Sequence, residues 1–229
     1  MVICGLLCYN SNAVFSNPAA TAARFSSVSG VVSYKSAIDE AYVEINIEKA
    51  LQLAINENDR LMIPAATTAE IVMTCGATVK ISPKSEVQIG YNNIRLNRGG
   101  IWVNYVSAKR SDGKITFKVE TPAGTAGVKG TQFVVKAIGD QSEKNKKAVQ
   151  PQGPAEEKIN KTVVQVNEGV VNFETGDGQS CDIIAGEKLS YIVGSKLCKP
   201  FKANASENIL DEGNSISPDV NPWLLRMKQ

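Results

Sequence analysis

Histidine is absent from this sequence of 229 residues. Without an imidazole, the chain lacks Ser-His and Cys-His nucleophile pairs, histidine-based proton transfer and most forms of zinc catalysis. No two cysteines have the CxxC spacing that is typical of a zinc site. We therefore expect no catalytic centre, no metal site and no cofactor, and a protein that is not an enzyme.

Paired carboxylates are the one alternative route to catalysis, as in glycoside hydrolysis. The nearest candidates are Glu57 with Asp59 and Asp211 with Glu212. Both pairs lie in polar turns or tails, where solvated charge is the ordinary explanation.

An excess of charge is also missing, because the formal net charge is only +2. Lysine and arginine are scattered among the acidic residues, so no sustained positive field exists to hold a phosphate backbone. We expect no nucleic-acid partner. Beyond the N-terminus, no segment approaches the ~20 apolar residues needed to cross a bilayer, so we expect no integral membrane span in the mature chain.

The N-terminus is apolar over Met1–Tyr9 and is followed by the small residues of Ser11–Ala13. This pattern predicts a signal peptide or N-terminal leader over residues 1–24, and hence a periplasmic or extracellular protein of the bacterial cell envelope. No lysine or arginine precedes the apolar run, so a buried N-terminal strand remains the alternative.

Three cysteines would remain after removal of such a leader. Cys181 and Cys198 bracket residues 183–193 and could close a disulfide worth about 3 kcal/mol in an oxidising compartment. Cys75 would then be a buried thiol. The alternative, in which all three are small apolar core residues, stays open.

Apolar residues alternate with polar ones through most of the chain, which is the pattern of strands with one buried face. Clear examples are Val43–Ile47, Leu51–Ile55, Ile101–Tyr105 and Ile115–Val119. Turn residues such as Asp112-Gly113 separate them. We predict an all-β fold of many short, mainly antiparallel strands, arranged as a solenoid-like or sandwich domain, and the pattern excludes a parallel α/β sheet.

Two polar stretches interrupt this pattern. Residues 139–161 are charged and rich in Gln and Pro, which predicts a flexible loop within a β domain over residues 25–198. Residues 199–229 form the predicted C-terminal tail. In this tail Trp223-Leu224-Leu225 is a small apolar anchor that could dock on this domain or on a partner.

A weak internal repeat places a glycine between strand residues at three points. The repeats are Val28–Val32, Leu96–Val103 and Val166–Val171. Glycine at such positions permits a bulge or a close crossing of two backbones, and stacked units would suit a coiled β architecture.

Several motifs, in the same order, resemble those of the FecR domain family. FKVETPAGTAGVKGTQF at residues 117–133 is similar to the family signature of a strand, a Thr-Pro turn, small residues and Val-Arg/Lys-Gly-Thr with an aromatic. The signature residues are Thr121, Pro122, Gly127, Val128, Lys129, Gly130, Thr131 and Phe133. Weaker similarities at 28–32, 58–61, 81–87 and 167–171 extend the resemblance over roughly residues 28–193.

The signature also has a physical interpretation of its own. Pro122 fixes a turn, and the glycines permit tight backbone paths. A phosphate-binding loop needs Gly-Lys-Ser/Thr at the start of a helix, whereas here Lys129 precedes Gly130 and the chain continues into a strand. We therefore interpret these residues as structural.

The resemblance limits the expected function. Classical FecR regulators combine a cytoplasmic anti-sigma segment, one transmembrane helix and a periplasmic part that senses an outer-membrane transporter, and this sequence shows neither of the first two. The resemblance thus implies a stand-alone exported module that binds or scaffolds an envelope protein. Independently of the resemblance, Trp102 and Tyr105 are candidate exposed anchors. Strand alternation places Trp102 opposite Ile101 and Val103, so Trp102 is exposed if those two are buried; a core position for Trp102 is the alternative. The alternative is a glycan or peptidoglycan binding module, for which Tyr91-Asn92-Asn93 and Trp102–Tyr105 are the only hints.

Overall fold

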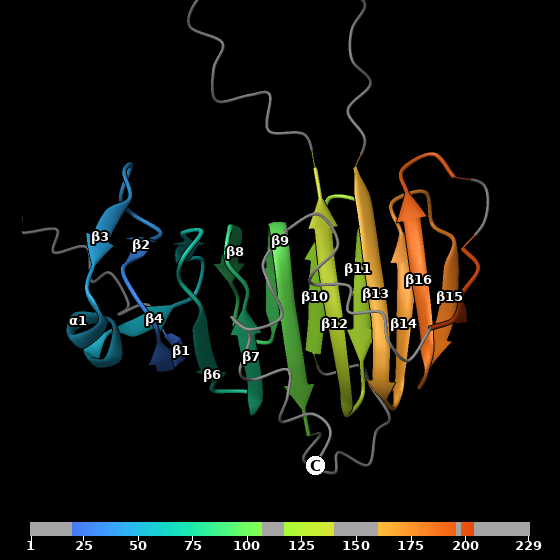
Figure 1. Ribbon diagram of the computed structural model, residues 1–229, viewed down its shortest axis with the longest axis horizontal. Coiled ribbons are helices and arrows are strands. Elements are labelled where there is room, and N and C mark those ends of the chain that lie inside the picture. The colour runs from blue at the N-terminus through green and yellow to red at the C-terminus, as the bar shows by residue number, and fades with distance from the viewer. Residues whose placement is uncertain (1–19, 107–116, 140–159, 196–197, 204–229) are drawn as a thin grey trace, which may run out of the picture.

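The computed structural model describes residues 20–106, 117–139, 160–195 and 198–203 (Figure 1). Strand pairings divide these residues into two sheets that share strand β9. Sheet A contains, in spatial order, β4 (Ala54–Asn56), β1 (Thr21–Val28), β6 (Ala69–Met73), β7 (Ala77–Ile81), β9 (Asn93–Tyr105), β12 (Thr131–Ile138), β13 (Lys161–Glu168), β16 (Glu187–Ile192) and β17 (Phe201–Lys202).

Sheet B lies against sheet A and follows a similar order along the molecule. It contains β3 (Val43–Ile45), β2 (Val32–Lys35), β5 (Arg60–Ile63), β8 (Ser85–Ile89), the first part of β9, β10 (Phe117–Thr121), β11 (Gly124–Val128), β14 (Val170–Thr175) and β15 (Ser180–Ile184). Among these pairings only β9 with β10 is parallel. The prediction of an all-β fold with mainly antiparallel strands is therefore confirmed.

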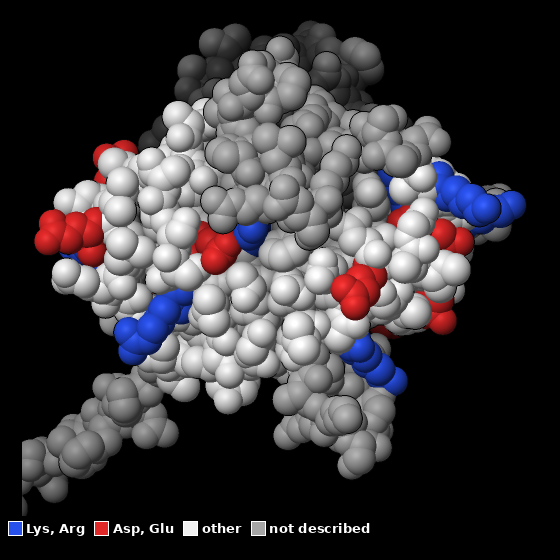
Figure 2. Space-filling model, turned by 60° about the horizontal axis from the view of Figure 1, so that its bottom comes forward, with Lys and Arg blue, Asp and Glu red and all other residues white. Residues whose placement is uncertain are grey.

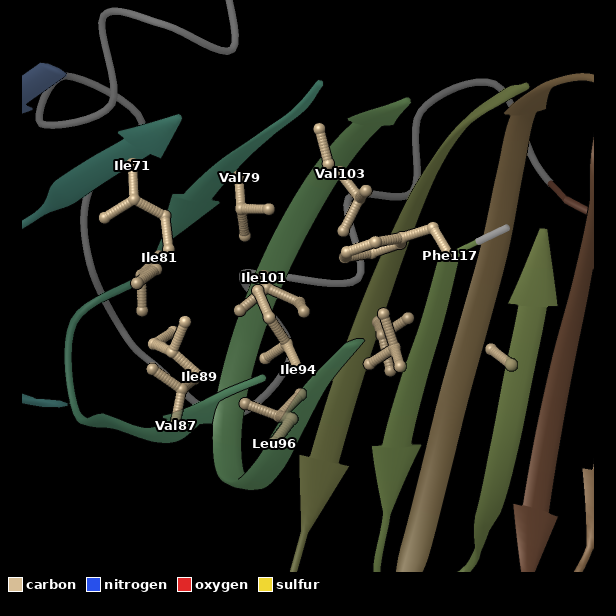
Figure 3. Close-up of a cluster of buried hydrophobic side chains, with 14 of the residues drawn as sticks. Ile71, Val79, Ile81, Val87, Ile89, Ile94, Leu96, Ile101, Val103 and Phe117 are labelled. Carbon is tan, nitrogen blue, oxygen red and sulfur yellow. The ribbon is translucent and has the colours of Figure 1, made fainter. Parts of the chain in front are cut away.

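The core fills the space between the two sheets as one continuous apolar cluster. Figure 3 shows how the inward side chains meet: Val79 and Ile101 come from sheet A, whereas Val87 and Ile94 come from sheet B. All four are fully buried. Two-residue alternation produces this layer, because every second side chain of a strand points to the same face. The arrangement is a sandwich, open at both ends.

One short helix interrupts the strands where the sequence predicts only strands. Helix α1 spans Ile47–Gln52, and the Asn46 side chain caps it by accepting a hydrogen bond from the Lys49 backbone N–H at 2.9 Å. The helix packs against β1 and buries Ala50. The expectation of alternating strand residues through Ile47 and Leu51 is thus wrong. No helix in the described part of the chain has the length and apolar character of a membrane span.

The ordered sandwich extends slightly beyond the predicted domain limits. Strand β1 begins at Thr21, four residues before the expected boundary, and it buries Ala22 and Ala23. At the other end, β17 lies within the predicted tail and pairs with β16. The predicted leader before residue 20, most of the predicted loop 139–161 and the tail after residue 203 lie outside the described residues.

In each of the three repeats, one glycine lies where the chain passes from one sheet to the other. Gly30 follows β1, Gly99 lies inside β9, and Gly169 separates β13 from β14. A Cβ at any of them would come within 2.6 Å of a buried hydroxyl residue: Thr67, Ser85 and Thr131, respectively. Close approach of two chain segments at each corner therefore requires glycine.

Candidate interaction surface

The outer face of sheet A carries a continuous row of side chains across neighbouring strands. Each residue of the row is the register partner of the next, so the side chains stand side by side at the strand spacing of about 4.8 Å. The row, which we call the outer row, consists of Glu70, Lys80, Trp102, Val134, Gln165, Lys188 and Phe201.

Trp102 lies at the centre of the outer row. The Nζ atom of Lys80 lies 4.9 Å from the centroid of the Trp102 ring, a cation–π distance. The same Nζ atom lies 3.7 Å from the Glu70 carboxylate. Among the described residues, the Trp102 indole N–H has no acceptor. The outer row therefore combines an aromatic ring, charged side chains and an indole N–H that has no acceptor among the described residues.

Trp102 belongs to a small apolar cluster on this outer face. The cluster consists of Trp102, Val134 and Val163, which expose 9%, 5% and 0% of their surface and are separate from the main core. We call these three residues the outer cluster. Lys136 pairs in register with Val163, and Lys188 stands in the outer row; both are buried as well. With Lys80, three lysines thus flank the outer cluster.

The two aromatic side chains that the sequence predicts as exposed anchors lie on opposite faces of sheet A, and both are buried. Trp102 does face away from Ile101 and Val103, as alternation predicts, but it is buried and not exposed. Tyr105 shares the inward face of Ile101 and Val103, exposes 6% and stacks on Phe117 with ring centroids 5.7 Å apart. The expectation that Tyr105 is an exposed contact is therefore wrong.

The signature residues build the connection from sheet B to sheet A. Thr121 ends β10, and its Oγ1 donates to the Gly124 carbonyl at 2.8 Å and accepts from the Gly124 N–H at 3.2 Å, which closes the turn through Pro122. The Thr121 and Thr162 hydroxyls are 2.7 Å apart, which ties this turn to β13.

The second half of the signature turns the chain into β12. Gly127 and Val128 are buried in β11, Lys129 is exposed, and Gly130 has a positive φ of 80°. Strand β12 begins at Thr131, and Phe133 is fully buried. Since a strand and not a helix follows Lys129, the residues do not have the form of a phosphate-binding loop.

Asp59, which the sequence analysis names only as half of a candidate carboxylate pair, is buried. It exposes 1% of its surface. It accepts hydrogen bonds from the Tyr34 hydroxyl at 2.7 Å, the Ala37 N–H at 2.9 Å and the Asn56 N–H at 2.8 Å. The expectation of a solvated charge at Asp59 is thus wrong. Burial, with the neighbouring Asp59, raises the pKa of Tyr34 well above its ordinary value, so Tyr34 remains a donor.

A disulfide joins Cys181 of β15 to Cys198, with the two Cα atoms 5.9 Å apart. The bridge ties the edge strand of sheet B to the segment that leads into β17 of sheet A. Cys75 is a free, half-buried thiol, and burial raises its pKa. In the described ranges, no group of three or more Cys, Asp or Glu side chains could hold a metal ion.

Replacing Cys181 and Cys198 by serine should lower the free energy of unfolding by about 3 kcal/mol, because the bridge closes a loop of 17 residues. Urea unfolding of the wild-type chain with and without reductant measures this effect. The double variant is the control, since reductant should leave its midpoint unchanged. Equal midpoints for oxidised and reduced wild-type chain would contradict the prediction.

Comparison with known proteins adds a family and two structures. The model of the family described as FecR protein matches residues 59–172. Two crystal structures of a Parabacteroides distasonis protein proposed to be an anti-sigma factor, at 1.65 and 2.50 Å resolution, align with 15% identity and a TM-score of 0.46. Each alignment covers 63% of this chain and 59% of that chain, so less than two thirds of that protein is matched. No curated protein matches the sequence.

Proposed function

Since this chain belongs to the FecR family through residues 59–172, we propose that it is a non-catalytic signalling module of the bacterial cell envelope that binds or scaffolds a protein partner. It would correspond to the periplasmic part of FecR signalling proteins. The observation that carries the proposal is the outer row of sheet A with Trp102 at its centre.

The composition of this face suits a protein interface. A central tryptophan and two valines provide the apolar contact, and polar or charged side chains surround them, as in the core and rim of many interfaces. Lys136 and Lys188 make one flank cationic, whereas Glu70 offsets the charge of Lys80 on the other. The partner that fits is a polypeptide segment with apolar side chains and adjacent carboxylates.

Basic and acidic side chains are interspersed on the molecular face shown in Figure 2. The described residues visible on that face form no broad positive patch, which supports recognition of a protein over a phosphate backbone. The cationic flank of the outer cluster is a local feature, suited to a few carboxylates.

Two further observations support the non-catalytic and exported parts of the proposal. The Asp59 carboxylate accepts three hydrogen bonds from its own fold, which gives this member of the candidate carboxylate pair a structural role. The Cys181–Cys198 bridge is the kind of bond that persists in an oxidising compartment such as the periplasm.

Site-directed photocrosslinking in envelope extracts tests the proposed surface. We expect a photoreactive residue at Gln165, in the outer row, to crosslink a discrete protein partner. A matched probe at the exposed Glu174 of sheet B should not. Trp102→Ala should remove the Gln165 product, because a central aromatic anchor contributes about 2 kcal/mol or more to binding. Equal products from both probes, or a product insensitive to Trp102→Ala, would refute this surface.

Glycan or peptidoglycan binding is the second candidate, and one observation favours it. Tyr91 exposes 53% of its surface in the turn between β8 and β9. Nearby, Glu120 accepts hydrogen bonds from Asn93 and Arg95. An exposed ring beside polar groups is a device that binds sugars. Sedimentation with peptidoglycan that depends on Tyr91 and not on Trp102 would favour this candidate.

A further inference from the structure

We propose that the outer cluster is the docking site of the chain's own C-terminal segment, residues 204–229, with Trp223-Leu224-Leu225 as the apolar anchor. The docking stands on its own evidence. Its consequence, that the segment competes with the envelope partner, rests on the proposed function above.

The first argument is the low exposure of the outer cluster. Trp102, Val134 and Val163 point away from the core, yet they expose 9%, 5% and 0% of their surface. In-sheet neighbours alone leave such side chains partly in water, so these values are typical of a covered sheet face. Among the described elements, α1 packs against β1, and the main contacts of β12 and β13 are with other strands.

The second argument is the position at which the segment leaves the sandwich. Strand β17 pairs with β16, and Phe201 is the register partner of Lys188 at the end of the outer row. The next residues therefore start on sheet A, four strand spacings or about 19 Å from β9. At about 3.3 Å per residue, residues 204–229 are long enough to reach Trp102 and return.

The third argument is the chemistry of the segment. It contains one aromatic anchor, Trp223-Leu224-Leu225, to match the apolar surface of the outer cluster. Arg226 and Lys228 follow the anchor, so the net charge of the segment is −2, and the flanking lysines are opposite in sign to the four acidic residues that precede the anchor. These acidic residues are Glu207, Asp211, Glu212 and Asp219.

Other parts of the chain fit this face less well. The sequences of residues 107–116 and 140–159 contain no aromatic residue. Residues 1–19 contain Tyr9 and Phe15 but no carboxylate to face the lysines. The C-terminal segment alone combines an aromatic anchor with acidic side chains.

The accessibility of Trp102 to acrylamide tests the docking without any partner. Trp102 and Trp223 are the only tryptophans, so Trp223→Phe makes Trp102 the single fluorescent reporter of the full chain. Truncation after Ala203 should increase acrylamide quenching and shift Trp102 emission to longer wavelength. If truncation unfolds the sandwich, the full-length Trp223→Ala, Leu224→Ala, Leu225→Ala variant provides the same comparison. Unchanged quenching in folded variants would overturn the proposal.

Binding in trans gives a second, quantitative test. A synthetic peptide of residues 204–229 should bind the truncated chain, with an affinity that falls as salt increases. Trp223→Ala in the peptide should weaken binding about 30-fold, the ratio that corresponds to about 2 kcal/mol for a central aromatic anchor. Trp102→Ala in the truncated chain should do the same, whereas Tyr91→Ala should leave binding unchanged. Equal effects of Trp102→Ala and Tyr91→Ala would contradict docking at the outer cluster.

The two proposals fail in different ways. If the peptide binds but no partner crosslinks at Gln165, the docking is retained and the proposed function is rejected. If a partner crosslinks but removal of the segment changes neither Trp102 quenching nor the crosslink yield, the function is retained and the docking is rejected.

Discussion

Replacing Asp59 by alanine should lower the free energy of unfolding by about 3 to 4 kcal/mol, because three partly buried donors then lose their acceptor at about 1 kcal/mol or slightly more each. Those donors are the Tyr34 hydroxyl and the backbone N–H groups of Ala37 and Asn56. The carboxylate thus connects the segment after β2 to the tight turn between β4 and β5. Urea unfolding followed by circular dichroism measures the loss.

Tyr34→Phe is the matched control for Asp59→Ala. It removes one of the three hydrogen bonds and keeps the ring, so it should cost only about 1 kcal/mol. A loss for Asp59→Ala no larger than that for Tyr34→Phe would show that the backbone donors find other acceptors. The network would then not be the main restraint on this turn.

Replacing Gly99 by alanine should lower the free energy of unfolding by about 4 kcal/mol, from a left-handed backbone penalty of about 1 to 2 kcal/mol and an overpacking cost of about 1 to 3 kcal/mol. Gly99 has a φ of 88°, and an added Cβ would lie 2.5 Å from the Ser85 Cα. Two hydrogen bonds hold Ser85 in place and oppose a shift of its backbone. Its hydroxyl accepts from the Gly100 N–H at 3.0 Å and donates to the Gly100 carbonyl at 3.2 Å.

Gly76→Ala separates the two causes. Gly76 has a similar φ of 92°, but an added Cβ would meet nothing within 4 Å. This variant should therefore cost only the backbone penalty of about 1 to 2 kcal/mol. Thermal unfolding of both variants compares them directly, and equal losses would mean that the corner at Gly99 tolerates a methyl group.

The sequence predicts the strands well because burial on one face enforces a two-residue period. Phe117 and Val119 alternate in the sequence and lie in the core of the structure. The glycines of the weak repeat indicate close backbone crossings, and the structure locates those crossings at the corners between the sheets. These features are local, so they can be recognised without knowledge of the partner strands.

The exceptions arise where tertiary contacts or local capping decide the outcome. Around α1, Leu51, Leu53 and Ile55 alternate as in a strand, but the Asn46 cap and the packing of Ala50 favour one short helix. Asp59 lies in a polar turn, and only the fold brings Tyr34 across to it. No sequence pattern reports such a long-range hydrogen bond.

The proposed interaction surface shows the same limit. Alternation correctly places Trp102 opposite Ile101, but whether an outward side chain is exposed depends on what lies over the sheet. Tyr105 shares the inward face with Val103, so two-residue alternation alone would have assigned it to the core. Aromatic side chains are thus poor indicators of a surface unless their face is known first.

Strand β9 has a mechanical consequence for the whole molecule. Its first part pairs with β8 and β10, and its last part pairs with β7 and β12. The N-terminal and C-terminal halves therefore meet along a single continuous stretch of backbone that belongs to both layers. Because both halves share this strand, we expect them to unfold in one cooperative transition and not repeat by repeat.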